Sequence, residues 1–246
     1  MVFALPMGFW LVEAFASSRL QVPVGLPIGS LLRRTIALSA SVSVSGAILA
    51  VPMALVWVLG NRLERIALTL LVFTPLLVGL LARNYAWIGV LSWLTQHGGL
   101  AHALGELLLY RPLGVGVVMA FLVAPMSFFI LVQTLRAVPP VQVDAAISLG
   151  VRPQRLLSGF YLRILRRPLI LAVLFNFCWS AGFFITPRMV GGGNFDLLGN
   201  VVVEYANLGR FDYSSTIALV LFAVCVCPVL GLVIYATRLR KLQLGT

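Results

Sequence analysis

The chain has 246 residues, of which 61% are hydrophobic and 10% are charged, and its formal net charge at pH 7 is +11. Soluble domains average about 45–50% apolar and about 25% charged residues, so this composition excludes an ordinary soluble domain and indicates a polytopic membrane protein. The positive charge is carried almost wholly by arginine, with Lys241 as the only lysine. We interpret it as arginine that holds loops on the cytoplasmic side of a membrane, rather than as a nucleic-acid-binding surface.

Six apolar segments are candidate membrane spans, because a helix needs about 20 apolar residues to cross the hydrocarbon core. The first, Met1 to about Ala16, is short and contains Pro6, so it is a tilted or incomplete span, or the true start lies upstream. It has neither the basic region nor the cleavage site of a signal peptide. The other five are Thr35–Leu59, Ile66–Trp93, Leu113–Gln133, Leu169–Pro187 and Tyr213–Ala236. The sequence therefore predicts an all-α protein with a single transmembrane domain over residues 1–246.

The distribution of basic residues predicts the orientation of these spans. If the N-terminus lies inside, the loops 60–65, 134–167 and 237–246 are cytoplasmic and carry 11 basic residues, against six in the outer loops. The positive-inside rule favours this arrangement. Four acidic residues then lie outside: Glu106, Asp196, Glu204 and Asp212.

The loop 134–167 is the longest cytoplasmic segment, and its first part predicts a short helix. Pro139 and Pro140 end the preceding span and are tolerated in the first turn of a new helix. The helix would run from Val141 to Leu149, and Gly150 suits the left-handed residue that commonly follows a helix.

The second part of this loop is amphipathic. At about 100° per residue, a set of apolar residues falls on one side and the arginines on the other. The apolar set is Leu157, Phe160, Tyr161, Ile164 and Leu165; the arginines are Arg152, Arg155, Arg163, Arg166 and Arg167. We expect a helix that lies along the inner membrane surface, with its arginines toward lipid phosphates and cytosol.

The short helix carries a recognisable motif, Asp144-Ala145-Ala146, three residues, then Gly150. It resembles the cytoplasmic motif of the membrane-spanning subunits of type I ATP-binding-cassette (ABC) importers, with Asp144 in place of the usual Glu and Arg163 where a proline is expected. The resemblance implies the fold of that transmembrane domain. It also implies an ATPase-coupling helix formed by Asp144, Ala145, Ala146, Leu149 and Gly150. In the family this helix docks in a cleft of the nucleotide-binding subunit.

Further stretches look like the polyamine branch of these permeases: RNYAW (Arg83 to Trp87), ITPRMVGGG (Ile185 to Gly193), the segment from Gly199 to Leu221, and Ala137 to Ala146. The resemblance implies a permease in a bacterial inner membrane that carries spermidine or putrescine, although similar permeases carry other small solutes, including ferric iron. It also implies three kinds of partner. These are two ATPase subunits, a second permease subunit that is identical or related, and an extracytoplasmic binding protein.

Four residues are candidates for the translocation path: Arg83, Tyr85, Trp87 and Glu204. A charged residue within a span usually faces a partner or a watery cavity, but Arg83 lies near the outer end of its span and is equally explained by snorkelling. Tyr85 and Trp87 are also typical of an aromatic belt at the interface. Glu204 faces a cationic solute or the binding protein, or is a solvated loop charge. Prolines at 75 and 125 predict kinks or breaks in two spans.

Several functions are not supported by the sequence. It has no phosphate-binding Gly-x4-Gly-Lys-[Ser/Thr] loop, so ATP hydrolysis is expected from a partner chain, and no cofactor is expected. His97 and His102 are five residues apart with no third ligand, which argues against a metal site. Cys178, Cys225 and Cys227 are expected to be buried and inert. The remaining alternatives are an intramembrane enzyme, which would need a catalytic pair at membrane depth, and a secondary transporter driven by an ion gradient.

Overall fold

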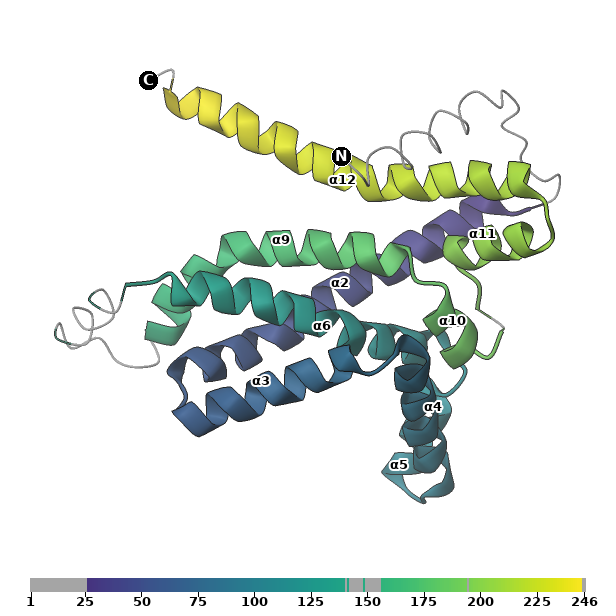
Figure 1. Ribbon diagram of the computed structural model, residues 1–246, viewed down its shortest axis with the longest axis horizontal. Coiled ribbons are helices and arrows are strands. Elements are labelled where there is room, and N and C mark those ends of the chain that lie inside the picture. The colour runs from purple at the N-terminus through teal and green to yellow at the C-terminus, as the bar shows by residue number, and fades with distance from the viewer. Residues whose placement is uncertain (1–25, 140, 142–147, 149–155, 194, 245–246) are drawn as a thin grey trace.

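The computed structural model describes residues 26–139, 141, 148, 156–193 and 195–244, and within these residues every regular element is a helix (Figure 1). The predicted first span, Met1 to Ala16, lies outside the described residues. The helices are α2 (Ile28–Leu59), α3 (Arg62–Leu77), α4 (Leu80–Gln96), α5 (Leu100–Leu108), α6 (Pro112–Arg136), α9 (Leu162–Ala181), α10 (Ile185–Val190), α11 (Leu198–Asn207) and α12 (Phe211–Leu244).

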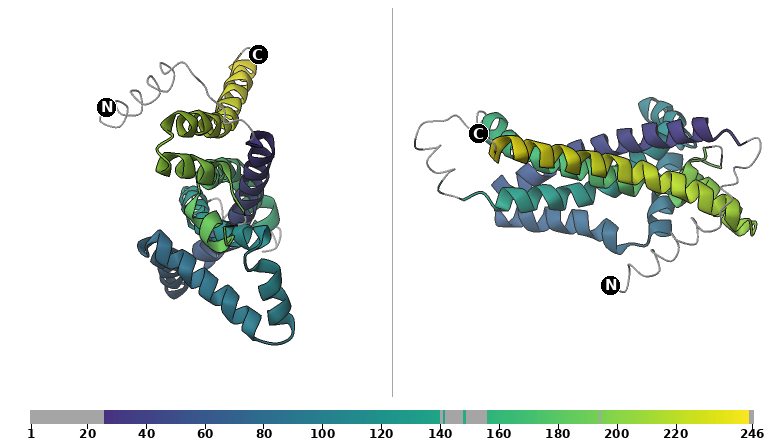
Figure 2. Two further views of the ribbon diagram at one scale, coloured as in Figure 1. Left: turned by 90° about the vertical axis from the view of Figure 1, so that its right-hand side faces the viewer. Right: turned by 90° about the horizontal axis from the view of Figure 1, so that it is seen from above.

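Helices α2, α6 and α9 pack against one another and form the centre of the molecule (Figures 1 and 2). Their close approach depends on small residues, as is usual for helices that associate in a membrane. Gly46 of α2 shows the tightest case, because a Cβ atom there would lie 2.6 Å from Val123 Cγ2 and 3.2 Å from the Ala120 carbonyl oxygen of α6. Further along α2, Ala50 and Ala54 are fully buried in a cluster with Phe128 and Leu131. The three helices therefore form one packed body.

The ends of the helices separate the predicted cytoplasmic loops from the predicted outer loops. The turn between α2 and α3, the last residues of α6, the start of α9 and the end of α12 lie toward one end of the molecule (Figures 1 and 2). Helices α10 and α11 lie at the other end. This arrangement agrees with the basic-residue pattern, because the described parts of loops 60–65, 134–167 and 237–246 lie toward one end.

Four helices are long and apolar enough to cross a membrane, and a bent pair makes a fifth candidate within the described residues. The pair corrects the sequence prediction, because Ile66–Trp93 is not one continuous helix. Helix α3 ends at Leu77, α4 begins at Leu80, and the two helices meet at 109°. Pro75 lies in the last turn of α3, where it removes a backbone donor, and Val78 and Gly79 are extended.

The amphipathic stretch before α9 also differs from the prediction. Residues Leu156–Tyr161 form one π-helical segment that runs directly into α9, and Pro168 lies inside that helix. Tyr161 and Leu165 are buried against Phe128 and Leu131 of α6, so this apolar side packs on protein. A separate helix on the membrane surface is therefore wrong for the described part of this stretch. The apolar span covers Gly159–Ala181 and not Leu169–Pro187, because the chain leaves the helix at Gly182 and Ile185–Pro187 belong to α10.

Helix α12 packs on α11 and α9, and only a small share of its span is buried. It contacts α9 through two cysteines, since Cys178 Sγ lies 3.4 Å from the Cys225 carbonyl oxygen. All three cysteines are free. Cys178 and Cys225 are half-buried, but Cys227 is exposed, so the expectation that it is buried was wrong.

Candidate functional site

The predicted coupling residues Asp144, Ala145, Ala146, Leu149 and Gly150 lie outside the described residues. Two positions of the predicted short helix are described, Val141 and Ser148, and both are helical and exposed. Helix α6 ends at Arg136, shortly before Pro139, as the sequence predicts. The assignment of Val141–Leu149 as a coupling helix remains a prediction.

The end of α6 that enters this loop is attached to α2 and α3 through Trp57. The guanidinium of Arg136 lies 5.5 Å from the Trp57 ring centroid, and that of Arg65 lies 5.6 Å from it. Trp57 Nε1 donates a hydrogen bond of 3.0 Å to Thr69 Oγ1. Arg65 also donates to the carbonyl oxygens of Val58 (2.8 Å) and Gly60 (3.1 Å). One indole therefore joins three helices at the end where the coupling loop begins, which the sequence analysis missed.

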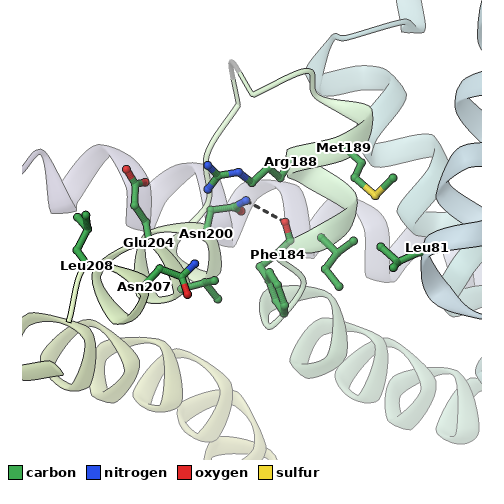
Figure 3. Close-up of a pocket in the computed structure, with 10 residues that line it drawn as sticks. Leu81, Phe184, Arg188, Met189, Asn200, Glu204, Asn207 and Leu208 are labelled. Atoms are coloured by element: carbon green, nitrogen blue, oxygen red, sulfur yellow. Dashed lines mark hydrogen bonds between the residues drawn. The ribbon is translucent and has the colours of Figure 1, made fainter. Parts of the chain in front are cut away.

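A cavity of about 490 Å³ lies at the opposite end of the molecule (Figure 3). Its lining comes from three separate stretches of chain: the start of α4, the residues from 184 to 189, and α11 with the residue that follows it. The lining residues are Leu81, Phe184, Ile185, Arg188, Met189, Asn200, Val203, Glu204, Asn207 and Leu208. We call this cavity the outer pocket, after the side on which the predicted orientation places it.

Hydrogen bonds hold the walls of the outer pocket in place. Asn200 Nδ2 donates to the Phe184 carbonyl oxygen at 2.9 Å, which fixes α11 against the start of α10 (Figure 3). The N-terminus of α11 is held on α2, because the Leu198 backbone N–H donates to the buried Thr35 Oγ1 at 3.0 Å. Between α10 and α11 the chain turns through Gly192, whose φ of +64° suits glycine. These hydrogen bonds therefore hold α10 and α11, which line the pocket, in position.

Two opposite charges line the outer pocket without pairing. Arg188 and Glu204 are both exposed, and among the described residues neither has an ion-pair partner within 4.0 Å. Figure 3 shows their head groups on the same side of the pocket as the Asn200 amide. Asn207 adds an exposed amide one helical turn after Glu204. The arrangement can bind a polar solute, and within the described residues no group of three or more His, Cys, Asp or Glu residues could hold a metal ion.

The other candidates for the translocation path lie on α4, outside the lining of the pocket. Tyr85 is 67% exposed, whereas Trp87 packs against Phe121 of α6 with ring centroids 5.0 Å apart. Arg83 is half-buried, and its Nε is buried without a hydrogen-bond partner within the described structure. The neighbouring Asn84 is fully buried, and both of its amide atoms lack such a partner. The structure therefore brings Glu204 together with Arg188 but not with Arg83, Tyr85 or Trp87.

Neutral polar side chains join the three central helices, and sequence reasoning missed them. Asn176 of α9 donates hydrogen bonds to Ser127 Oγ of α6 (2.7 Å) and to the Ser43 carbonyl oxygen of α2 (3.4 Å). Ser180 Oγ lies 3.4 Å from the Ser39 carbonyl oxygen. All five residues are almost completely buried. The spacing of Ser39 and Ser43, one helical turn apart, was the available signal.

An all-helical fold with several helices apolar and long enough to cross a membrane is that of a multi-pass membrane protein. The chain belongs to the family described as binding-protein-dependent transport system inner membrane component, which it matches over residues 21–242. It is also similar to the inner membrane ABC transporter permease protein YdcU of Escherichia coli (strain K12). The two are 26% identical over 232 residues, covering 86% of this chain and 71% of the relative. The predicted class and inner-membrane location are thereby confirmed.

Proposed function

We propose that the protein is the permease subunit of an ATP-driven ABC importer and forms the translocation pathway for a small solute. The family match over residues 21–242 carries this proposal. The Ala-Ala-x3-Gly motif at Ala145 to Gly150 supports it, because that motif marks the ATPase-coupling helix in the importers that the chain resembles. ATP hydrolysis belongs to the partner subunits. Two ATPase subunits, a second permease subunit and an extracytoplasmic binding protein complete the assembly.

The packing of the described helices supports a mechanism for coupling. The predicted coupling helix lies between α6 and the segment that leads into α9. Arg136 attaches the end of α6 to Trp57 of α2. Trp57 packs against a cluster of buried residues, and Leu165 near the start of α9 belongs to that cluster. A movement of the docked ATPases would therefore displace the three central helices together. Such a displacement biases the pathway between inward-facing and outward-facing states.

For the substrate we propose a polyamine such as spermidine or putrescine as the first class to test. The motifs RNYAW and ITPRMVGGG carry this choice. Ferric iron is the alternative, because similar permeases carry it. The binding protein sets much of the specificity in such systems.

A secondary transporter driven by an ion gradient fits the described residues less well. Such a transporter uses ionisable groups inside its bundle. Among the described residues, every buried polar side chain is a neutral Ser, Thr or Asn. The family match also names a binding-protein-dependent system.

Co-purification from gently solubilised native membranes tests the proposal. We expect the wild-type chain to recover an ATPase subunit and Gly150→Arg to lose it. The introduced arginine side chain would add bulk and positive charge to the predicted docking surface. Gly159→Arg is the matched control, since Gly159 is exposed and a Cβ atom added there would meet no other atom within 4 Å. Recovery of no ATPase with the wild-type chain in several detergents would overturn the proposal.

A further inference from the structure

The outer pocket has a charge pattern that the polyamine assignment does not explain. Among the described residues, its lining contains one arginine and one glutamate, Arg188 and Glu204, and no other charged residue. A solute with amines at both ends would satisfy Glu204 but would bring a second cation toward Arg188. Two like charges brought together without a counter-charge weaken binding, so the second amine lowers the affinity of such a solute for the pocket.

The two charged groups come from different elements that are fixed relative to each other. Arg188 lies in the last turn of α10, and Glu204 lies on α11. The hydrogen bond from Asn200 to the Phe184 carbonyl oxygen links these two helices, and Asn200 itself lines the pocket beside the Arg188 guanidinium (Figure 3). Because Asn200 is almost fully buried and engaged in this bond, it supports the frame rather than the ligand. The two helices that carry the charges are therefore held together by the fold.

The rest of the lining suits a short hydrocarbon chain with polar ends. Leu81, Ile185, Met189 and Val203 supply apolar walls, while Asn207 supplies an amide that can donate to a carboxylate or accept from an ammonium group. Arginine pairs well with a carboxylate because its guanidinium donates two parallel hydrogen bonds. Glutamate pairs with a protonated amine. A ligand that satisfies both residues carries one group of each kind.

We infer that the outer pocket binds a small solute that carries both a protonated amine and a carboxylate, with Glu204 receiving the amine and Arg188 receiving the carboxylate. The inference rests on the proposed transport function, but it replaces the polyamine as the solute that this pocket recognises. Both residues act as specificity-determining contacts. Opposite charges on the ligand and the pocket then match at both ends.

Three compounds with four-carbon chains test this inference directly: putrescine, with two amines; 4-aminobutyrate, with an amine and a carboxylate; and succinate, with two carboxylates. Equilibrium binding of each labelled compound is measured on the purified permease complex in nanodiscs, without the binding protein. We expect the wild-type complex to bind 4-aminobutyrate about three- to fivefold more tightly than either other compound, the size expected for one partly exposed charge contact.

Two charge-removing variants make the test specific. Arg188→Gln should shift the preference toward putrescine, and Glu204→Gln should shift it toward succinate, each by a similar factor. Arg210→Gln is the control, because Arg210 lies over the Tyr213 ring and outside the pocket lining. It should leave the order of the three compounds unchanged.

The inference is overturned if the wild-type complex prefers putrescine, or if the two variants weaken all three compounds equally. Its failure differs from failure of the proposed function. A complex that co-purifies with its ATPase but prefers putrescine would keep the importer assignment and reject this pocket chemistry. A permease that binds 4-aminobutyrate with the expected variant pattern but recovers no ATPase would keep this pocket chemistry and reject the importer assignment.

Discussion

Arg136, the last residue of α6, lies over the indole ring of Trp57 on α2, with its guanidinium carbon 5.5 Å from the ring centroid. Arg65 lies over the same ring at 5.6 Å. This contact fixes the helix from which the predicted coupling loop departs. In the proposed mechanism, this contact would connect movement of the ATPases to α2 and α6.

Replacement of Trp57 by leucine removes both cation–π contacts and the hydrogen bond to Thr69. We expect a loss of about 1–3 kcal/mol in the free energy of unfolding, since each such contact contributes about 0.5–1 kcal/mol. Equilibrium unfolding in mixed detergent micelles measures this change in the free energy of unfolding. Trp93→Leu is the matched control, because Trp93 is 55% exposed and stacks only on His97 among the described residues. An equal loss in both variants would contradict the account.

The hydrogen bond between Asn176 and Ser127 should stabilise the central bundle. Asn176→Ala leaves the buried Ser127 hydroxyl without this donor and opens a small cavity. Interhelical hydrogen bonds in membranes contribute about 0.6 kcal/mol on average and up to about 1.7, so we expect a coupling energy in this range. A double-mutant cycle with Ser127→Ala measures that coupling. Strictly additive losses would show that the bond contributes nothing.

Gly46 should not tolerate even one added methyl group. In Gly46→Ala the new Cβ meets Val123 Cγ2 at 2.6 Å and the Ala120 carbonyl oxygen at 3.2 Å, so α2 and α6 must separate. We expect a destabilisation of about 1–3 kcal/mol. Gly89→Ala on α4 is the control, because no atom lies within 4 Å of its Cβ position. It should be neutral or slightly stabilising, since alanine favours helices.

The Thr35 hydroxyl should anchor the α11 side of the outer pocket. Thr35→Val keeps the shape of the side chain but leaves the buried Leu198 N–H without its acceptor, at an expected cost of about 1–3 kcal/mol. Thr74→Val provides the comparison, because the Thr74 hydroxyl is exposed and bonds only to the Leu70 carbonyl oxygen of its own helix. Thermal unfolding of the two purified variants should differ by several degrees; identical midpoints would rule out the anchoring role.

The positions of the apolar spans could be predicted from the sequence because hydrophobic length is a local property. Leu113–Gln133 corresponds to α6 within a few residues, and Thr35–Leu59 lies inside α2. Hydropathy did not show the break at Val78 and Gly79, because the apolar run continues through it, but Pro75 predicted a kink or break in this span. The side chains of Tyr161 and Leu165 were assigned to the membrane surface for a related reason. Lipid and the interior of a helical bundle are similarly apolar, so an amphipathic pattern does not distinguish them.

Only one of the two charged residues of the outer pocket could be predicted as a site residue from the sequence. Glu204 was a candidate on its own, whereas Arg188 was counted as an ordinary outer-loop arginine. The two residues are 16 positions apart, and they share a pocket because the chain turns back through Gly192 and Gly193 and α11 docks on α2. Local sequence periodicity does not predict that the chain folds back in this way. Arg83, Tyr85 and Trp87 remain predicted path residues, with Trp87 packed on Phe121.

Binding-protein-stimulated ATP hydrolysis tests whether this chain couples a binding protein to its ATPase subunits. The whole complex is reconstituted in nanodiscs, with the wild-type chain beside Ala146→Glu, and ATP hydrolysis is measured with and without the cognate binding protein. We expect stimulation with the wild-type chain and its loss in Ala146→Glu, while the permease keeps its wild-type unfolding midpoint. Full stimulation in Ala146→Glu, or no ATP hydrolysis with the wild-type complex, would contradict the assignment of this chain as an ATPase-coupled permease.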